Sequence, residues 1–111
     1  MARKVSVGKH LVGGTTYTMY TVPEGYRASW NLLYMINNTS NAKSFTVSWM
    51  DKDDNLICHI FQNYPISSKT YLMFDSGAWV NMEAGQYVTI QAESGTDADA
   101  IMSLEVERNN A

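Results

Sequence analysis

The segment TTYTMYTVPEGYRASWNLLYMI, residues 15–36, carries the strongest structural signal in the chain. Its two halves are rich in β-forming residues and alternate with a period of two, which places the side chains of an extended strand on opposite faces. They meet at Pro23-Glu24-Gly25, where proline presets one turn residue and glycine can take a positive φ. The segment therefore predicts two strands joined at a tight corner, and an all-β protein.

Turn-forming clusters recur at short intervals along the rest of the chain. They lie at residues 13–14, 37–41, 51–55, 63–68, 76–77, 83–85 and 94–99. Short β-rich runs between such turns are typical of sandwiches and barrels, and 111 residues are enough for one domain. We predict a single antiparallel β-sandwich, jelly-roll-like, with about eight strands. Residues 1–14 would form an N-terminal arm or first edge strand, 15–108 the sandwich and 109–111 a C-terminal tail.

Strict alternation predicts which face of each strand meets the core. In the long run after the first turn, the even positions are taken as the core face: Ala28, Trp30, Leu32, Tyr34 and Ile36. In the later runs the predicted core residues are Phe45, Val47, Trp49, Val88, Ile90, Ala92, Met102, Leu104 and Val106. The last strand then has an acidic outer face, with Glu105 and Glu107.

The run from Leu56 to Phe61 is apolar on both faces, which indicates either a central strand or a subunit interface. Aromatic and methionine residues that follow it add apolar surface that a small domain can hardly bury alone, so an interface is favoured. The residues predicted to make subunit contacts are Ile57, His59, Phe61, Tyr71, Met73 and Trp79.

The charge pattern argues against two classes of partner. A net charge of -3 and a pI near 5.2 do not give the broad basic surface on which nucleic-acid binding relies. The apolar runs are far shorter than the ~20 residues of a membrane span. Arg3, Lys4 and Lys9 form the only cationic cluster, which is interpreted either as a solvated arm or as a docking arm for an acidic or polar surface.

Candidate catalytic and metal-binding residues do not form a convincing set. Cys58 and His59 are adjacent, so in a strand they point to opposite faces and cannot act as a pair without a bulge. The run 51–55 resembles the start of a calcium loop but lacks its glycine and bidentate glutamate, so an acidic turn is favoured. We expect no enzyme, no cofactor and no metal. The role of Cys58 is left open.

The pattern from Thr16 to Trp49 resembles small β-sandwich structural and decoration proteins of tailed bacteriophage virions. The matching residues are YTVPEGY at 20–26, WNLLYMIN at 30–37, NNTSNA at 37–42 and SFTVSW at 44–49. MEAGQYVTI at 82–90 is similar to a later segment of the same proteins. The resemblance spans roughly Thr16 to Val106 and covers turns and core strands, with no active-site residues.

This resemblance implies a non-enzymatic virion structural protein, assembled in the host cytoplasm. Capsid decoration is the leading hypothesis, and a tail or fibre component is the alternative. The implied partners are further copies of the chain, with a trimer among the arrangements considered, and the major capsid protein or tail proteins. A carbohydrate-binding module for host recognition is a separate hypothesis, for which Trp79 is the main exposed candidate because Trp30 and Trp49 fall on predicted core faces.

Overall fold

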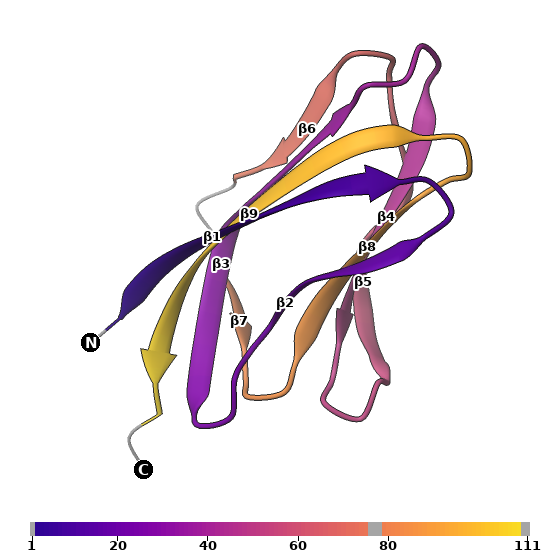
Figure 1. Ribbon diagram of the computed structural model, residues 1–111. Coiled ribbons are helices and arrows are strands. Elements are labelled where there is room, and N and C mark those ends of the chain that lie inside the picture. The colour runs from indigo at the N-terminus through magenta and orange to yellow at the C-terminus, as the bar shows by residue number, and fades with distance from the viewer. Residues whose placement is uncertain (1, 76–78, 110–111) are drawn as a thin grey trace.

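The computed structural model describes residues 2–75 and 79–109, and this part of the chain contains nine strands (Figure 1). They are β1 (Arg3–Val12), β2 (Thr16–Thr21), β3 (Tyr26–Asn37), β4 (Lys43–Met50), β5 (Leu56–Ile66), β6 (Tyr71–Phe74), β7 (Val80–Met82), β8 (Tyr87–Ala92) and β9 (Asp97–Arg108). The described residues contain no helix of the length and hydrophobicity needed to span a membrane.

The strands form two antiparallel sheets packed face to face. The first sheet has the order β1-β9-β3-β6, with β7 also paired to β3, and the second has the order β2-β8-β4-β5. β6 and β7 pair with successive parts of β3, so they occupy one strand position between them. Each sheet thus combines strands from distant parts of the chain, as in a jelly roll. The predicted jelly-roll-like sandwich of about eight strands is confirmed.

The turn at Pro23-Glu24-Gly25 carries the chain from the second sheet to the first. Gly25 has a φ of 83°, which an L-residue with a side chain adopts at a cost, and the Tyr26 amide donates to the Pro23 carbonyl at 3.1 Å. The predicted corner is therefore present. It joins β2 and β3 across the sandwich instead of pairing them in one sheet.

The core lies between the two sheets, and three of the predicted strand faces line it. The predicted core residues of β4, β8 and β9 are buried, apart from the half-buried Trp49. The Trp49 indole N–H donates to Gln86 Oε1 at 3.2 Å. Trp30 and Phe45 are the largest fully buried side chains, and burial of each such side chain stabilises the fold by about 1.5–3 kcal/mol.

The predicted core face of β3 is correct only as far as Trp30. The pairing of β3 with β9 shifts register between Trp30 and Leu32, and one extra residue in a strand reverses the faces of all residues that follow. The buried residues after this bulge are Leu33, Met35 and Asn37. The prediction that Leu32, Tyr34 and Ile36 belong to the core is therefore wrong, because it assumed an unbroken alternation.

Candidate contact surface

Large apolar side chains that remain exposed gather mainly in two places. Tyr71, Met73, Trp79 and Ile101, each 43–59% exposed, lie on the outer face of the first sheet. Leu56, Ile57 and Tyr64 lie along β5, the edge strand of the second sheet. Clusters of this kind on a soluble protein commonly mark contact sites, so these two surfaces are the candidates.

The first surface is continuous across three neighbouring strands. Tyr34 of β3 lies directly opposite Met73 of β6 and Ile101 of β9, and directly opposed residues of paired strands share a face. The Tyr71 ring stacks on Tyr34 with a centroid distance of 5.2 Å. We call this surface the Tyr34 patch, which consists of Leu32, Tyr34, Ile36, Tyr71, Met73 and Ile101.

The bulge in β3 creates the Tyr34 patch. Without the register shift after Trp30, Tyr34 would point into the core and Leu33 would point outward. Gly8 of β1 lies opposite Ile101, and because glycine has no side chain, the β1 side of Ile101 is left open. At Gly8, therefore, no β1 side chain covers the apolar surface of the patch.

A row of polar residues crosses the outer face of the second sheet. A single cross-strand row contains Thr18, Thr89, Ser48 and His59, and the Ser48 hydroxyl is hydrogen-bonded to His59 Nδ1 at 2.9 Å. A hydroxyl-rich face of this kind is compatible with water. The outer face of the first sheet thus carries a continuous apolar patch, whereas a row of polar residues crosses the outer face of the second, and this difference makes the Tyr34 patch the stronger candidate for a contact surface.

The predicted subunit-contact residues are divided among three places. Tyr71 and Met73 belong to the Tyr34 patch, and Trp79 lies further along the same outer face. Ile57 and His59 are exposed on β5. Phe61 is half-buried and packs edge-to-face against Phe74 of β6 at 6.2 Å. Phe61 therefore packs between the edge strands of the two sheets, in a contact within one chain.

The three basic residues of the predicted docking arm lie on β1, which is paired along its length with β9. Lys4 shares the outer face with Glu105, its cross-strand partner. Arg3 and Lys9 lie at odd positions, opposite the inward-facing Val106 and Ala100, and are separated from each other by about 20 Å along the strand. The structure does not bring the three charges together.

A polar cluster borders the patch at the end of β3. His10 Nδ1 is 2.8 Å from Asp99 Oδ1, and the Asn38 amide donates to Asp99 Oδ2 at 2.9 Å. Asp97 Oδ1 lies 3.5 Å from His10 Nε2. The hydrogen bond with Asp99 raises the pKa of His10 above its ordinary value of 6.5. The same bond, followed by that from Asn38, lowers the pKa of Asp99 below 3.8.

These pKa shifts predict a window of pH in which the cluster stabilises the fold. Because the pKa of His10 is raised on folding, its contribution to the stability of the fold is fully present below pH 6.5 and is lost as the pH rises through the raised pKa. Because the pKa of Asp99 is lowered on folding, its contribution is fully present above pH 3.8 and is lost as the pH falls through the lowered pKa. The melting temperatures of the wild type and His10→Asn should therefore differ more at pH 5 than at pH 8. His59→Asn is the control for the loss of an imidazole, since His59 is hydrogen-bonded to the Ser48 hydroxyl and not to a carboxylate. An equal difference for His10→Asn at both pH values would contradict this assignment.

The acidic run at residues 51–55 forms a closed turn. Asp51 Oδ1 accepts the backbone N–H groups of Asp53 and Asn55 at 2.8 and 2.9 Å, and the bond from Asn55 is the main reason why the pKa of Asp51 is lowered. Cys58 is exposed on β5. Within residues 2–75 and 79–109, no three His, Cys, Asp or Glu side chains lie where they could hold a metal ion together.

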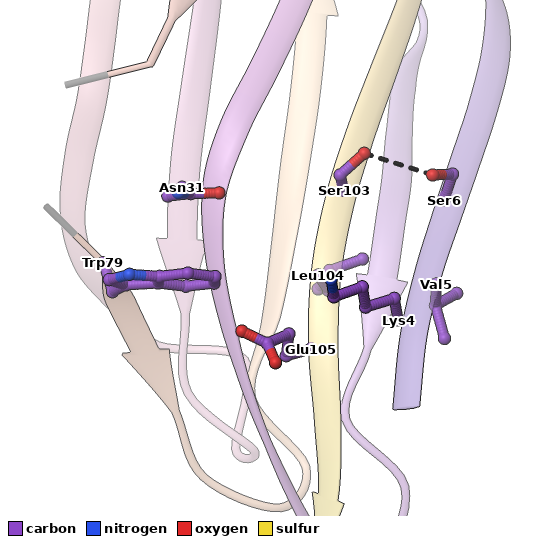
Figure 2. Close-up of a pocket in the computed structure, with 8 residues that line it drawn as sticks. All are labelled: Lys4, Val5, Ser6, Asn31, Trp79, Ser103, Leu104 and Glu105. Carbon is purple, nitrogen blue, oxygen red and sulfur yellow. Dashed lines mark hydrogen bonds between the residues drawn. The ribbon is translucent and has the colours of Figure 1, made fainter. Parts of the chain in front are cut away.

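A shallow hollow of about 350 Å³ lies on the outer face of the first sheet beside Trp79 (Figure 2). Lys4 and Ser6 of β1, Asn31 of β3 and the β9 residues Ser103 and Glu105 contribute polar side chains to it. Trp79 also borders a second hollow of about 240 Å³. Its ring is therefore accessible beside several hydrogen-bonding groups.

Comparison with known proteins shows likeness in fold. No family model and no curated protein matches the chain. A Bacillus endospore appendage subunit, from a structure described as a novel family of disulfide-linked pili, aligns with a TM-score of 0.60 and 12% identity over 99% of this chain and 88% of that one.

Capsid-protein structures of infectious bursal disease virus align less well. The T13 viral particle gives a TM-score of 0.45 at 9% identity, and the VP2 subviral particle gives 0.44 at 7%. This chain covers 35% and 38% of those two chains. Identities this low indicate likeness in fold alone, and the likeness to the pilus subunit, with its TM-score of 0.60, bears on the fold of the whole chain.

Proposed function

We propose that this protein is a non-enzymatic structural subunit that assembles by burying the Tyr34 patch against further copies of itself. The observation that carries the proposal is the contrast between the two outer faces, one with a continuous apolar surface across β6, β3 and β9 and the other rich in hydroxyl groups. The exposed apolar residues of β5, by comparison, follow a single edge strand and are interrupted by polar ones.

A repetitive assembly suits a patch of this kind. A standard specific interface buries about 800 Å² per partner, and many copies on one particle add avidity to contacts that are individually modest. Tyr71 and Met73, on the edge strand β6 of the first sheet, are 59% and 48% exposed, so their burial would remove much apolar surface from water. No cofactor is needed for this role.

We further propose that the assembly is a bacteriophage virion in which the protein decorates the capsid, with a tail component as the alternative. Support comes from the resemblance of YTVPEGY and MEAGQYVTI to virion sandwich proteins and from the jelly-roll order of the sheets. The likeness to a pilus subunit is consistent with a fold used in repeated assemblies. The major capsid protein is then the second partner.

The proposed contact is non-covalent. Cys58 is the one cysteine of these 111 residues, and one thiol per copy can join two copies but cannot link a longer series. The pilus subunit to which the chain is similar comes from appendages described as disulfide-linked, so this chain would differ from it in the chemistry of assembly. Oligomers should therefore persist in the presence of a thiol reductant.

The test of the virion assignment is an image, at residue resolution, of purified particles of the phage proposed to carry this protein, and particles without density for it would contradict the assignment. We expect jelly-roll density on the capsid, or at the tail in the alternative, with the Tyr34 patch covered by a neighbouring subunit. Density in which the patch faces solvent and the hydroxyl-rich face of the second sheet makes the contacts would contradict the proposed role of the patch.

A further inference from the structure

We propose that the hollow beside Trp79 binds a neutral hexopyranose residue of a glycan. This site lies on the same outer face as the Tyr34 patch but on the other side of Leu32, where β7 replaces β6 as the neighbour of β3. It would give the protein a ligand-binding activity in addition to its structural role. Three features of the hollow support the assignment.

The first feature is the accessible indole of Trp79. This side chain is 43% exposed, whereas Trp30 is fully buried and Trp49 is half-buried and hydrogen-bonded. Trp79 is held next to β3 because Val80 pairs with Trp30, and because the Ser29 hydroxyl donates to Asn81 Oδ1 at 2.6 Å. A positioned indole offers a flat apolar surface on which the C–H face of a sugar ring can stack.

The second feature is a set of polar groups at the level of the ring. Lys4 and Glu105 are directly opposed on β1 and β9, and Figure 2 shows the Glu105 carboxylate between Lys4 and Trp79. In the described part of the chain, neither side chain forms a hydrogen bond or an ion pair. Both are therefore free to bond to hydroxyl groups, with the ammonium donating and the carboxylate accepting.

The third feature is the balance of charge and size. One ammonium and one carboxylate in the lining cancel, which favours a neutral ligand over an anion or a cation. A volume of about 350 Å³ is at the lower end of small-molecule sites and is suited to one sugar residue. Asn31 adds an amide at the point where β3 bulges. A hexopyranose, which has an apolar ring face and hydroxyl groups around its edge, matches an indole surrounded by polar side chains.

The test is a titration of the full chain with D-glucose, D-galactose or N-acetylglucosamine, followed by the indole N–H signals of its three tryptophans in two-dimensional NMR. We expect the Trp79 signal to shift with one of these sugars, with a Kd of the order of 1 mM. The signals of Trp30 and Trp49 should not move. Trp79→Phe assigns the signal.

Matched variants test the roles of individual groups. Glu105→Gln should weaken binding by about tenfold or more, a loss of the size expected when a charged hydrogen-bonding group is removed. Trp79→Ala should weaken binding to a similar degree; because this variant lacks the reporter indole, its binding is followed by the backbone amide signals of Asn31 and Glu105, which line the hollow. Tyr64→Ala removes an aromatic side chain that is equally exposed at 43%, but on β5, and should leave binding unchanged. Unchanged Trp30 and Trp49 signals verify that each variant is folded.

Three results would overturn the proposal. The first is that the Trp79 signal does not shift with any of the three sugars at about 50 mM, well above the expected Kd. The second is an equal shift with adenosine or choline. The third is sugar binding that persists in the Trp79→Ala variant. The Ile101→Asp variant, which changes the Tyr34 patch, should still bind sugar. Sugar binding can therefore be disproved without affecting the proposed assembly role, and the assembly role can be disproved without affecting sugar binding.

Discussion

Leu33→Ala should lower the free energy of unfolding by about 2–5 kcal/mol, as expected for a leucine truncated in a core. Leu33 is fully buried between the sheets, whereas Leu32, one residue earlier, lies on the outer face because of the bulge in β3. Leu32→Ala should therefore cost only about 1 kcal/mol or less. Urea unfolding, followed by circular dichroism, measures both values.

The two leucines are matched controls for each other, since the same atoms are removed from neighbouring positions of one strand. Unbroken alternation from Trp30 would make Leu32 the core residue and Leu33 the exposed one. If Leu32→Ala proved to be the more costly change, the bulge would be absent and the Tyr34 patch would not exist as described.

Ile101→Asp should convert the assembled protein into monomers and raise the Kd of self-association at least a hundredfold. Ile101 is 44% exposed in the single chain and lies beside Tyr34 on the patch. A carboxylate there would have to be buried without a partner when the patch is covered, which costs several kcal/mol. Sedimentation velocity over a range of protein concentrations measures the change.

Thr89→Asp is the control for added charge. Thr89 is half-buried at the centre of the outer face of the second sheet, between Thr18 and Ser48. This variant should sediment like the wild type. Monomers from Thr89→Asp, together with intact oligomers from Ile101→Asp, would place the contact on the opposite face. Circular dichroism of both variants verifies that the β-sandwich is retained.

Much of the fold could be predicted because local signals in this chain agree with the tertiary structure. The alternation in β4, β8 and β9 identified their buried faces, and the turn before Tyr26 identified the corner between β2 and β3. For residues 56–61 the sequence favours a subunit interface over a central strand, and β5 lies at a sheet edge. Strand order depends on long-range pairing, which alternation within one strand does not report.

The Tyr34 patch was only partly predictable. Tyr71 and Met73 were among the predicted contact residues, but Tyr34 was assigned to the core and Ile101 was not identified. A signal was nevertheless present, because residues 32–36 are all apolar. Whichever set pointed inward, the other would leave apolar side chains outside. As at residues 56–61, a run that is apolar on both faces indicates a strand whose outer face is also covered, and this holds for β3.

We propose that the Tyr34 patch is the surface covered on assembly. Hydroxyl-radical footprinting of the wild-type protein, dilute and assembled, tests it directly because Met73 and Tyr71 on the patch and Tyr64 on β5 are all exposed in the single chain and react with the radical. We predict that assembly protects Met73 and Tyr71 and leaves Tyr64 reactive. Protection of Tyr64 with undiminished oxidation of Met73 and Tyr71 would contradict the claim and place the contact on the β5 edge.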